Sequence, residues 1–121
     1  MTKRILVVED QEDNRQILRD LLAHAGYAVL EVGDGEQALV AAAAHHPDMI
    51  LMDIQLPVLD GYETTRRIKA DPALKHIPII VVTSYALDGD EIKAFQAGCD
   101  AYVIKPFSTK ALLAKIREFL T

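Results

Sequence analysis

The sequence predicts an α/β domain in which helices cover both faces of a parallel five-stranded sheet. Short apolar runs alternate with helical patterns along the whole chain. Three of these runs are continuously apolar, which is typical of strands buried on both faces of a sheet. The length of 121 residues fits one domain. Because parallel strands need crossover connections, the alternation places helices on both faces of the sheet.

The expected strands differ in how strongly the sequence marks them. Continuous apolar runs at 5–8, 49–52 and 79–82 indicate three deeply buried strands. The segments 27–32 and 101–104 are weaker candidates for the remaining two. In chain order, a helical pattern follows each of the five segments.

The helices are marked by apolar faces and by capping residues. Apolar residues recur on one face of the first helix, and Gly26 ends it. The next three helices begin with capping-box spacing, in which an aspartate caps a free backbone N–H and the residue three positions later bonds back. These pairs are Asp34 with Gln37, Asp60 with Glu63, and Asp88 with Glu91. The last helix has its apolar face at Leu112, Leu113, Ile116, Phe119 and Leu120.

Composition excludes several classes of protein. Half of the residues are hydrophobic and 26% are charged, whereas disordered chains combine low apolar content with high net charge. The net charge is −5 and the basic residues are scattered, so we expect no nucleic-acid partner. No apolar run approaches the roughly 20 residues of a membrane helix, so we expect no membrane partner. The single cysteine, Cys99, cannot form an internal disulfide, and we expect it to be a small buried residue of a cytoplasmic protein.

Polar residues of chemically useful types follow the strands directly. Glu9 and Asp10 follow the first strand, Asp53 the third, Thr83 the fourth and Lys105 the fifth. In an open parallel sheet, the functional site lies beyond the carboxyl ends of the strands. We therefore expect these five side chains to converge at one edge of the sheet.

Three neighbouring carboxylates need a cation to balance their negative charge. Two carboxylates about 4 Å apart repel by on the order of 4 kcal/mol at an effective dielectric constant near 20. Glu9, Asp10 and Asp53 carry a formal charge of −3, which one divalent cation and Lys105 would balance. Oxygen ligands with open positions suit Mg²⁺, which commonly completes its coordination with phosphate oxygens. The pattern predicts a phosphoryl group as the incoming ligand, with Thr83 and Lys105 bonding its oxygens.

Asp53 is the best candidate for the residue that accepts the phosphoryl group. It follows the central strand, and carboxylates can form acyl phosphates. Histidine is the alternative acceptor. The four histidines lie in helical or loop segments away from the strand ends, and we expect them at the surface: His24, His45, His46 and His76.

Four motifs in order resemble the receiver domains of two-component response regulators. They are VVED at 7–10, LMDIQLPVLDG at 51–61, VVTS at 81–84 and YVIKPF at 102–107. The similarity extends from Lys3 to Phe119, and the intervals between the motifs also match the family. It implies the flavodoxin-like three-layer fold with strand order 2-1-3-4-5.

The resemblance assigns roles to individual residues. It implies that a histidine kinase or histidine phosphotransfer protein phosphorylates Asp53. It implies an Mg²⁺ site formed by Asp10, Asp53, Glu9 acting through water, and the backbone carbonyl of Gln55. Thr83 and Lys105 would bind the phosphoryl oxygens. The Lys105–Pro106 bond would be cis, which would direct the Lys105 ammonium at Asp53. Tyr102 would be the aromatic residue that switches together with Thr83. Tyr62 is expected to pack on the surface of the third helix.

The sequence departs from the family pattern at two positions. Ser84 follows Thr83 where alanine is common, which leaves the site accessible but could change the rate of dephosphorylation. Glu9 stands where many members have aspartate, a variation that leaves metal binding plausible. Gln55 and Tyr85 are candidates for residues that flank the phosphoryl group and limit attack by water.

We expect residues 1–121 to form a single receiver domain without an effector domain. Such a protein would act on a downstream protein, as a monomer or as a weak phosphorylation-dependent dimer. Two alternatives are an intermediate that passes the phosphoryl group onward and a phosphorylation-independent adaptor. We do not expect an enzyme, because phosphohydrolases on related folds often carry a second aspartate where this chain has Gln55. A flavin-binding module is disfavoured because the segment after the first strand is acidic rather than rich in glycine, serine and threonine.

Overall fold

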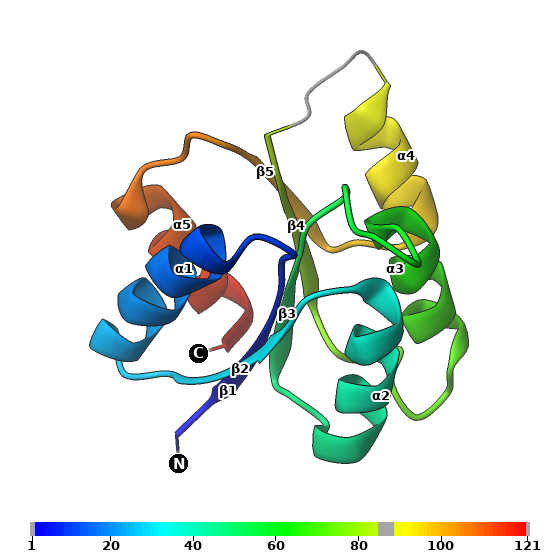
Figure 1. The fold of residues 1–121 in the computed structure, drawn as a ribbon, viewed down its shortest axis with the longest axis horizontal. Helices are drawn as coiled ribbons and strands as arrows, with labels where there is room; N and C mark the ends of the chain where they lie inside the picture. The colour runs from blue at the N-terminus through cyan, green and yellow to red at the C-terminus, as the bar shows by residue number, and fades with distance from the viewer. Residues whose placement is uncertain (1, 85–88, 121) are drawn as a thin grey trace.

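The computed structural model describes residues 2–84 and 89–120. Within them the chain alternates between strands and helices (Figure 1). The elements are β1 (Arg4–Val8), α1 (Glu12–His24), β2 (Ala28–Val32), α2 (Gly35–His45), β3 (Met49–Met52), α3 (Gly61–Ala70), β4 (Ile79–Thr83), α4 (Asp90–Ala97), β5 (Ala101–Ile104) and α5 (Thr109–Leu120). No helix in this part of the chain is long and apolar enough to span a membrane.

The strands form one parallel sheet in the order β2-β1-β3-β4-β5, which confirms the predicted fold class and strand order. The pairing register also determines where the site forms. Val8 pairs with Met52, so the residues that follow them, Glu9 and Asp53, begin at the same level of the sheet. Farther along the sheet, Thr83 of β4 pairs with Ile104 of β5, and Lys105 follows Ile104 directly. The predicted convergence at one sheet edge therefore follows from the register.

Two apolar layers hold the helices against the sheet. Helices α1 and α5 cover one face, and α2, α3 and α4 cover the other (Figure 1). On the first face, Leu22 of α1 and Ile116 of α5 pack with alternate residues of the central strands, and all of them are buried. On the second face, alanines of α2 and α4 and Ile68 of α3 contact the other set of strand residues. Burial on both sides explains why the central strands are apolar at every position.

The two described capping aspartates cap their helices as predicted, but the residues three positions later bond elsewhere. Gln37 Oε1 accepts from the Gly33 amide at 3.0 Å rather than from Asp34. The Glu63 carboxylate pairs with Arg66 and Arg67. The Asp34 side chain accepts a hydrogen bond from the Gln37 amide at 2.8 Å, and Asp60 accepts one from the Glu63 amide at 2.8 Å. Gly98 ends α4 in a left-handed conformation with φ of 109°, and buried Cys99 follows it. The third predicted cap pairs Asp88 with Glu91, and Asp88 lies outside the described residues.

The start of α3 is held unusually close to the end of β3. The Gly61 amide donates a hydrogen bond to the Ile54 carbonyl at 2.9 Å. A Cβ atom at Gly61 would lie 2.1 Å from the Asp53 carbonyl oxygen, a distance that the backbone could accommodate only by moving. Glycine is therefore required here by the close approach of two backbone segments, and this approach fixes the backbone that carries Asp53.

Candidate functional site

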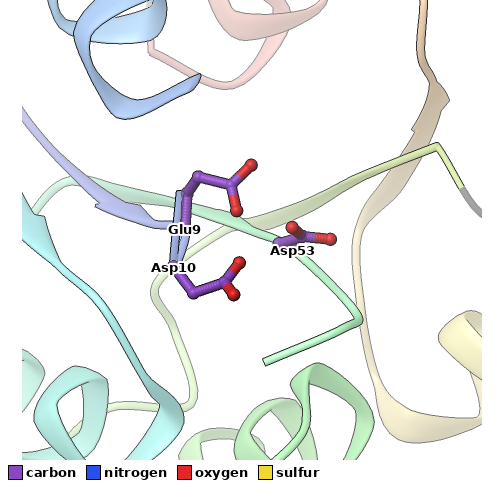
Figure 2. A group of neighbouring side chains, drawn as sticks. All are labelled: Glu9, Asp10 and Asp53. Carbon is purple, nitrogen blue, oxygen red and sulfur yellow. The ribbon is translucent and has the colours of Figure 1, made fainter. Parts of the chain in front are cut away.

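Three carboxylates lie side by side at the carboxyl edge of the sheet. Glu9 and Asp10 extend from the end of β1 and Asp53 from the end of β3 (Figure 2). One carboxylate oxygen from each residue lies within 4.8 Å of the others. The sheet therefore brings together the three acidic residues that the sequence predicted.

Lys105 joins this group from the β5–α5 connection. Its Nζ atom is 3.0 Å from Glu9 Oε1, and the Glu9 side chain is only 2% exposed. The Lys105 amide donates to the Thr83 carbonyl at 2.8 Å, and the Lys105–Pro106 bond is cis as predicted. The ammonium was expected to be directed at Asp53, whereas its ion pair is with Glu9. Glu9 is the more buried carboxylate and gains more from a neighbouring cation.

The carboxylates line an open cleft of about 340 Å³. Asp53 is one of its lining residues and accepts a weak hydrogen bond of 3.4 Å from the Gln55 amide. Gln55 is exposed at the rim, two residues after Asp53. The cleft is lined by Glu9, Asp10, Gln11, Asn14, Asp53, Gln55, Ser84 and Lys105. A small anion can therefore reach Asp53 from solvent.

The two hydroxyl residues at the end of β4 have different environments. Thr83 is 1% exposed and lies within the sheet beside β5, whereas Ser84 is exposed and lines the cleft. Tyr85, the other candidate from this segment, lies outside the described residues. The expected contact of Thr83 with a phosphoryl group therefore stays a prediction.

Tyr102 lies on β5, one strand away from Asp53 across β4. It pairs in register with Val81 and packs, half-buried, against the apolar layer that also contacts Tyr62. Tyr62 was expected on the surface of α3. It is instead half-buried, and its hydroxyl lies 3.3 Å from the backbone carbonyl of Asp90 in α4. Both tyrosines thus pack against the apolar layer on the α4 side of the sheet, and Tyr62 reaches the start of α4.

The four predicted surface histidines are exposed in the structure. They lie in α1, at the carboxyl end of α2 and before β4, away from the carboxylates. The positions of His24, His45, His46 and His76 agree with a site in which aspartate, rather than histidine, is the acceptor.

Crowding shifts the acid–base properties of the carboxylates. Burial, together with the hydrogen bond and charge of Glu9, raises the pKa of Asp53 to about 7. Burial also acts to raise the pKa of Glu9, but hydrogen bonds with Asp53 and Lys105 and the charge of Lys105 outweigh it and lower the pKa to about 2. Desolvation and Glu9 raise the pKa of Asp10. Glu9 therefore stays ionised at neutral pH, whereas ionisation of Asp10 and Asp53 beside it costs free energy.

The donor set fits Mg²⁺. All three side chains offer oxygen, and oxygens bound to one octahedral Mg²⁺ lie roughly 3–4 Å apart, compatible with the observed grouping. Lys105 offsets one of the three negative charges through its ion pair. The remaining charge of −2 matches a divalent ion, and the open cleft leaves room for its water ligands.

Sequence reasoning missed three residues around this site. Gln11 and Asn14 line the cleft, and Arg15 donates a hydrogen bond of 2.8 Å to the Glu9 carbonyl. All three lie in or just before the first turn of α1. The signal in the sequence is their position directly after a strand that ends in acidic residues, but the acidic character of this segment alone does not indicate their contacts.

Comparisons with known proteins identify the family. A model of the response regulator receiver domain matches residues 5–117. The chain belongs to the response regulator receiver family. It is therefore a receiver domain of the kind used in two-component signalling.

Relatives and solved structures agree with this receiver assignment. The polar-differentiation response regulator DivK of Brucella ovis is 46% identical over 120 residues, covering 99% of this chain and 98% of DivK. The receiver domain of a sensor histidine kinase from Pseudomonas aeruginosa PAO1 is 40% identical with a TM-score of 0.92, covering 99% of this chain and 98% of that one. That domain was crystallised with a magnesium ion coordinated in its active-site cleft. The chemotaxis protein CheY4 of Vibrio cholerae is 27% identical with a TM-score of 0.91, covering 98% and 99% of the two chains.

The raised pKa of Asp53 predicts a pH-dependent gain of stability in the metal-free Asp53→Asn variant. The folded pKa is about 7 and lies above the ordinary value of 3.8, so folding favours the protonated form. The wild type consequently loses stability as pH rises from about 4 to 7, whereas asparagine stays neutral. Because Asp53 is partly exposed, we expect a gain on the order of 1 kcal/mol at pH 7.5, or a few degrees in Tm.

Thermal unfolding in a chelating buffer between pH 4 and 8 measures this effect. Glu118→Gln, at the far end of α5, removes the same charge as a control and should leave Tm nearly unchanged. A difference between Asp53→Asn and wild type that does not vary with pH would contradict the assignment of the shift to Asp53.

Proposed function

We propose that this receiver domain takes a phosphoryl group from a histidine kinase or histidine phosphotransfer protein onto Asp53 in an Mg²⁺-dependent reaction. The observation that carries the proposal is the convergence of Glu9, Asp10, Asp53 and Lys105 at one open cleft. Of the three carboxylates, Asp53 combines access to the cleft with the central position at the end of β3.

In the proposed reaction, an Asp53 carboxylate oxygen attacks the phosphorus of a phosphohistidine. The phosphorus–nitrogen bond breaks, its electron pair returns to the imidazole ring, and an acyl phosphate forms on Asp53. Lys105, at the cleft beside Asp53, donates to a phosphoryl oxygen and balances its charge. Glu9 through water, Asp10, Asp53 and the Gln55 carbonyl would hold Mg²⁺, which would supply further positive charge for the phosphoryl oxygens.

Phosphorylation would then change the surface formed by α4, β5 and α5. It takes the charge at Asp53 from −1 to about −2 and adds acceptor oxygens for Lys105 and Thr83. Movement of Thr83 makes space for Tyr102, which lies on the neighbouring strand. Because Tyr102 and Tyr62 pack against the same apolar layer, and Tyr62 contacts the first residue of α4, inward rotation of Tyr102 alters the support of that helix.

The altered surface would bind a downstream protein. It carries exposed apolar side chains on neighbouring elements, with Ile92 63%, Phe95 46% and Ile104 46% exposed. Exposed apolar groups on adjacent elements favour a protein partner. We propose a signalling role rather than turnover of a separate substrate, because Gln55 offers an amide where an acid–base carboxylate would be needed.

Phosphorylation by a small donor tests the acceptor. We expect wild-type protein incubated with acetyl phosphate and Mg²⁺ to gain the mass of one phosphoryl group, which hydroxylamine should remove because it cleaves acyl phosphates. Asp53→Asn and samples with chelator should gain none, because the nucleophile or the balancing charge is lost. Asp20→Asn, an exposed change on α1, should be labelled like wild type. Labelling of Asp53→Asn would contradict the proposal, and an unlabelled wild type would favour the adaptor alternative.

The proposed switch predicts that Thr83 transmits the phosphoryl signal to Tyr102. Beryllium trifluoride, a phosphoryl analogue, should shift the NMR signals of the Tyr102 ring and of the α4 amides in the wild type. In Thr83→Ala the analogue should still shift the Asp53 amide, but the shift at Tyr102 should fall several-fold because the hydroxyl that follows the phosphoryl group is missing. Equal shifts of Tyr102 in the two proteins would rule out this route.

A further inference from the structure

Arg15 connects the backbone beside the carboxylates to the neighbouring strand. It lies in the first turns of α1, and its Nη1 atom donates a hydrogen bond of 2.8 Å to the main-chain carbonyl of Glu9. This carbonyl belongs to the peptide group that joins Glu9 to Asp10. The Arg15 side chain is 19% exposed, so most of it is enclosed by the protein.

Two carboxylates fix the orientation of the Arg15 guanidinium. Glu12 pairs with its Nη2 atom from the preceding turn, and Glu31 on β2 lies 3.7 Å from its Nε atom. Glu31 is itself held by two hydrogen bonds from Arg19 Nη1, at 2.9 and 3.1 Å. A planar guanidinium can bind several acceptors in fixed directions, which a lysine ammonium cannot reproduce.

The peptide groups around Glu9 are thereby tied to β2 through both a donor and an acceptor. The Glu9 amide donates to the Val32 carbonyl at 3.2 Å, and the Glu9 carbonyl is tied to Glu31 through Arg15. Without the hydrogen bond from Arg15 to the Glu9 carbonyl, the peptide group between Glu9 and Asp10 could rotate. Repulsion among the carboxylates would then move Asp10 away from Asp53.

We propose that Arg15 is a positioning residue that holds the Glu9–Asp10 backbone in the orientation required for Mg²⁺ binding. The inference rests on the metal site of the proposed function. Mg²⁺ demands near-ideal octahedral geometry, and groups that orient metal ligands typically affect metal affinity 10- to 100-fold. Arg15 offers the incoming ion no ligand atom, because a guanidinium has donors only.

The direction of the effect separates positioning from simple electrostatics. A cation near the site repels Mg²⁺, so if charge alone mattered, Arg15→Met would bind Mg²⁺ more tightly. If Arg15 positions the backbone, Arg15→Met should bind Mg²⁺ roughly 10-fold more weakly, even though an opposing charge is gone. Methionine retains an unbranched apolar side chain, which limits the loss of packing.

Titration of ¹⁵N-labelled protein with MgCl₂, followed by the NMR amide shifts of residues 9–11 and 53–55, measures the affinity. Arg66→Met is the matched control, because it makes the same change at an exposed arginine of α3 that pairs with Glu63, and it leaves the contacts of Arg15 in place. We expect its Mg²⁺ affinity to stay within about twofold of the wild type. Amide dispersion before the titration verifies that each variant is folded, so a general loss of stability is not counted as weaker binding.

Equal or tighter Mg²⁺ binding by Arg15→Met would overturn the role of Arg15 and leave the proposed function intact. A loss of affinity of the same size in Arg66→Met would also overturn it, because the loss would then not depend on the bond to the Glu9 carbonyl. Absence of Mg²⁺ binding by the wild type would overturn the proposed metal site, and this inference with it.

Discussion

Repulsion among Glu9, Asp10 and Asp53 is the interaction on which the rest of this site depends. The strand register leaves Glu9 and Asp53 at the same level of the sheet, and Asp10 follows directly. The fold holds these charges together because two apolar layers and the close contact of Gly61 with the β3 backbone fix the strand ends. Burial energy of the whole domain thus maintains a local arrangement that would otherwise separate, as is common where stability and function compete.

Most of the fold could be predicted because its signals are local and consistent. Uninterrupted apolar runs mark strands buried on two faces, and Asp34 and Asp60 mark helix starts through bonds to amides three residues away. Convergence of the site residues could also be predicted, since parallel strands end at one edge and each carries its polar residue directly after the apolar run.

The sequence does not show which of several nearby groups a side chain contacts in the folded protein. Lys105 pairs with Glu9 rather than Asp53, a choice set by the burial of Glu9, which spacing along the chain does not contain. Tyr62 turns toward α4, where a backbone carbonyl is within reach of its hydroxyl. Arg15 is one of several basic residues in the sequence, and only the three-dimensional structure separates its contact with the Glu9 carbonyl from an ordinary surface ion pair.

Substitution of Mg²⁺ by paramagnetic Mn²⁺ tests the central claim most directly, because Mn²⁺ broadens the NMR signals of nuclei near its binding site. At substoichiometric Mn²⁺, the account predicts that amide signals of residues 9–11, 53–55 and 105 disappear first, and that excess Mg²⁺ restores them. Broadening centred on another acidic segment, such as 34–36 or 118, or spread evenly over the surface, would contradict a single cation site at the carboxyl edge of the sheet.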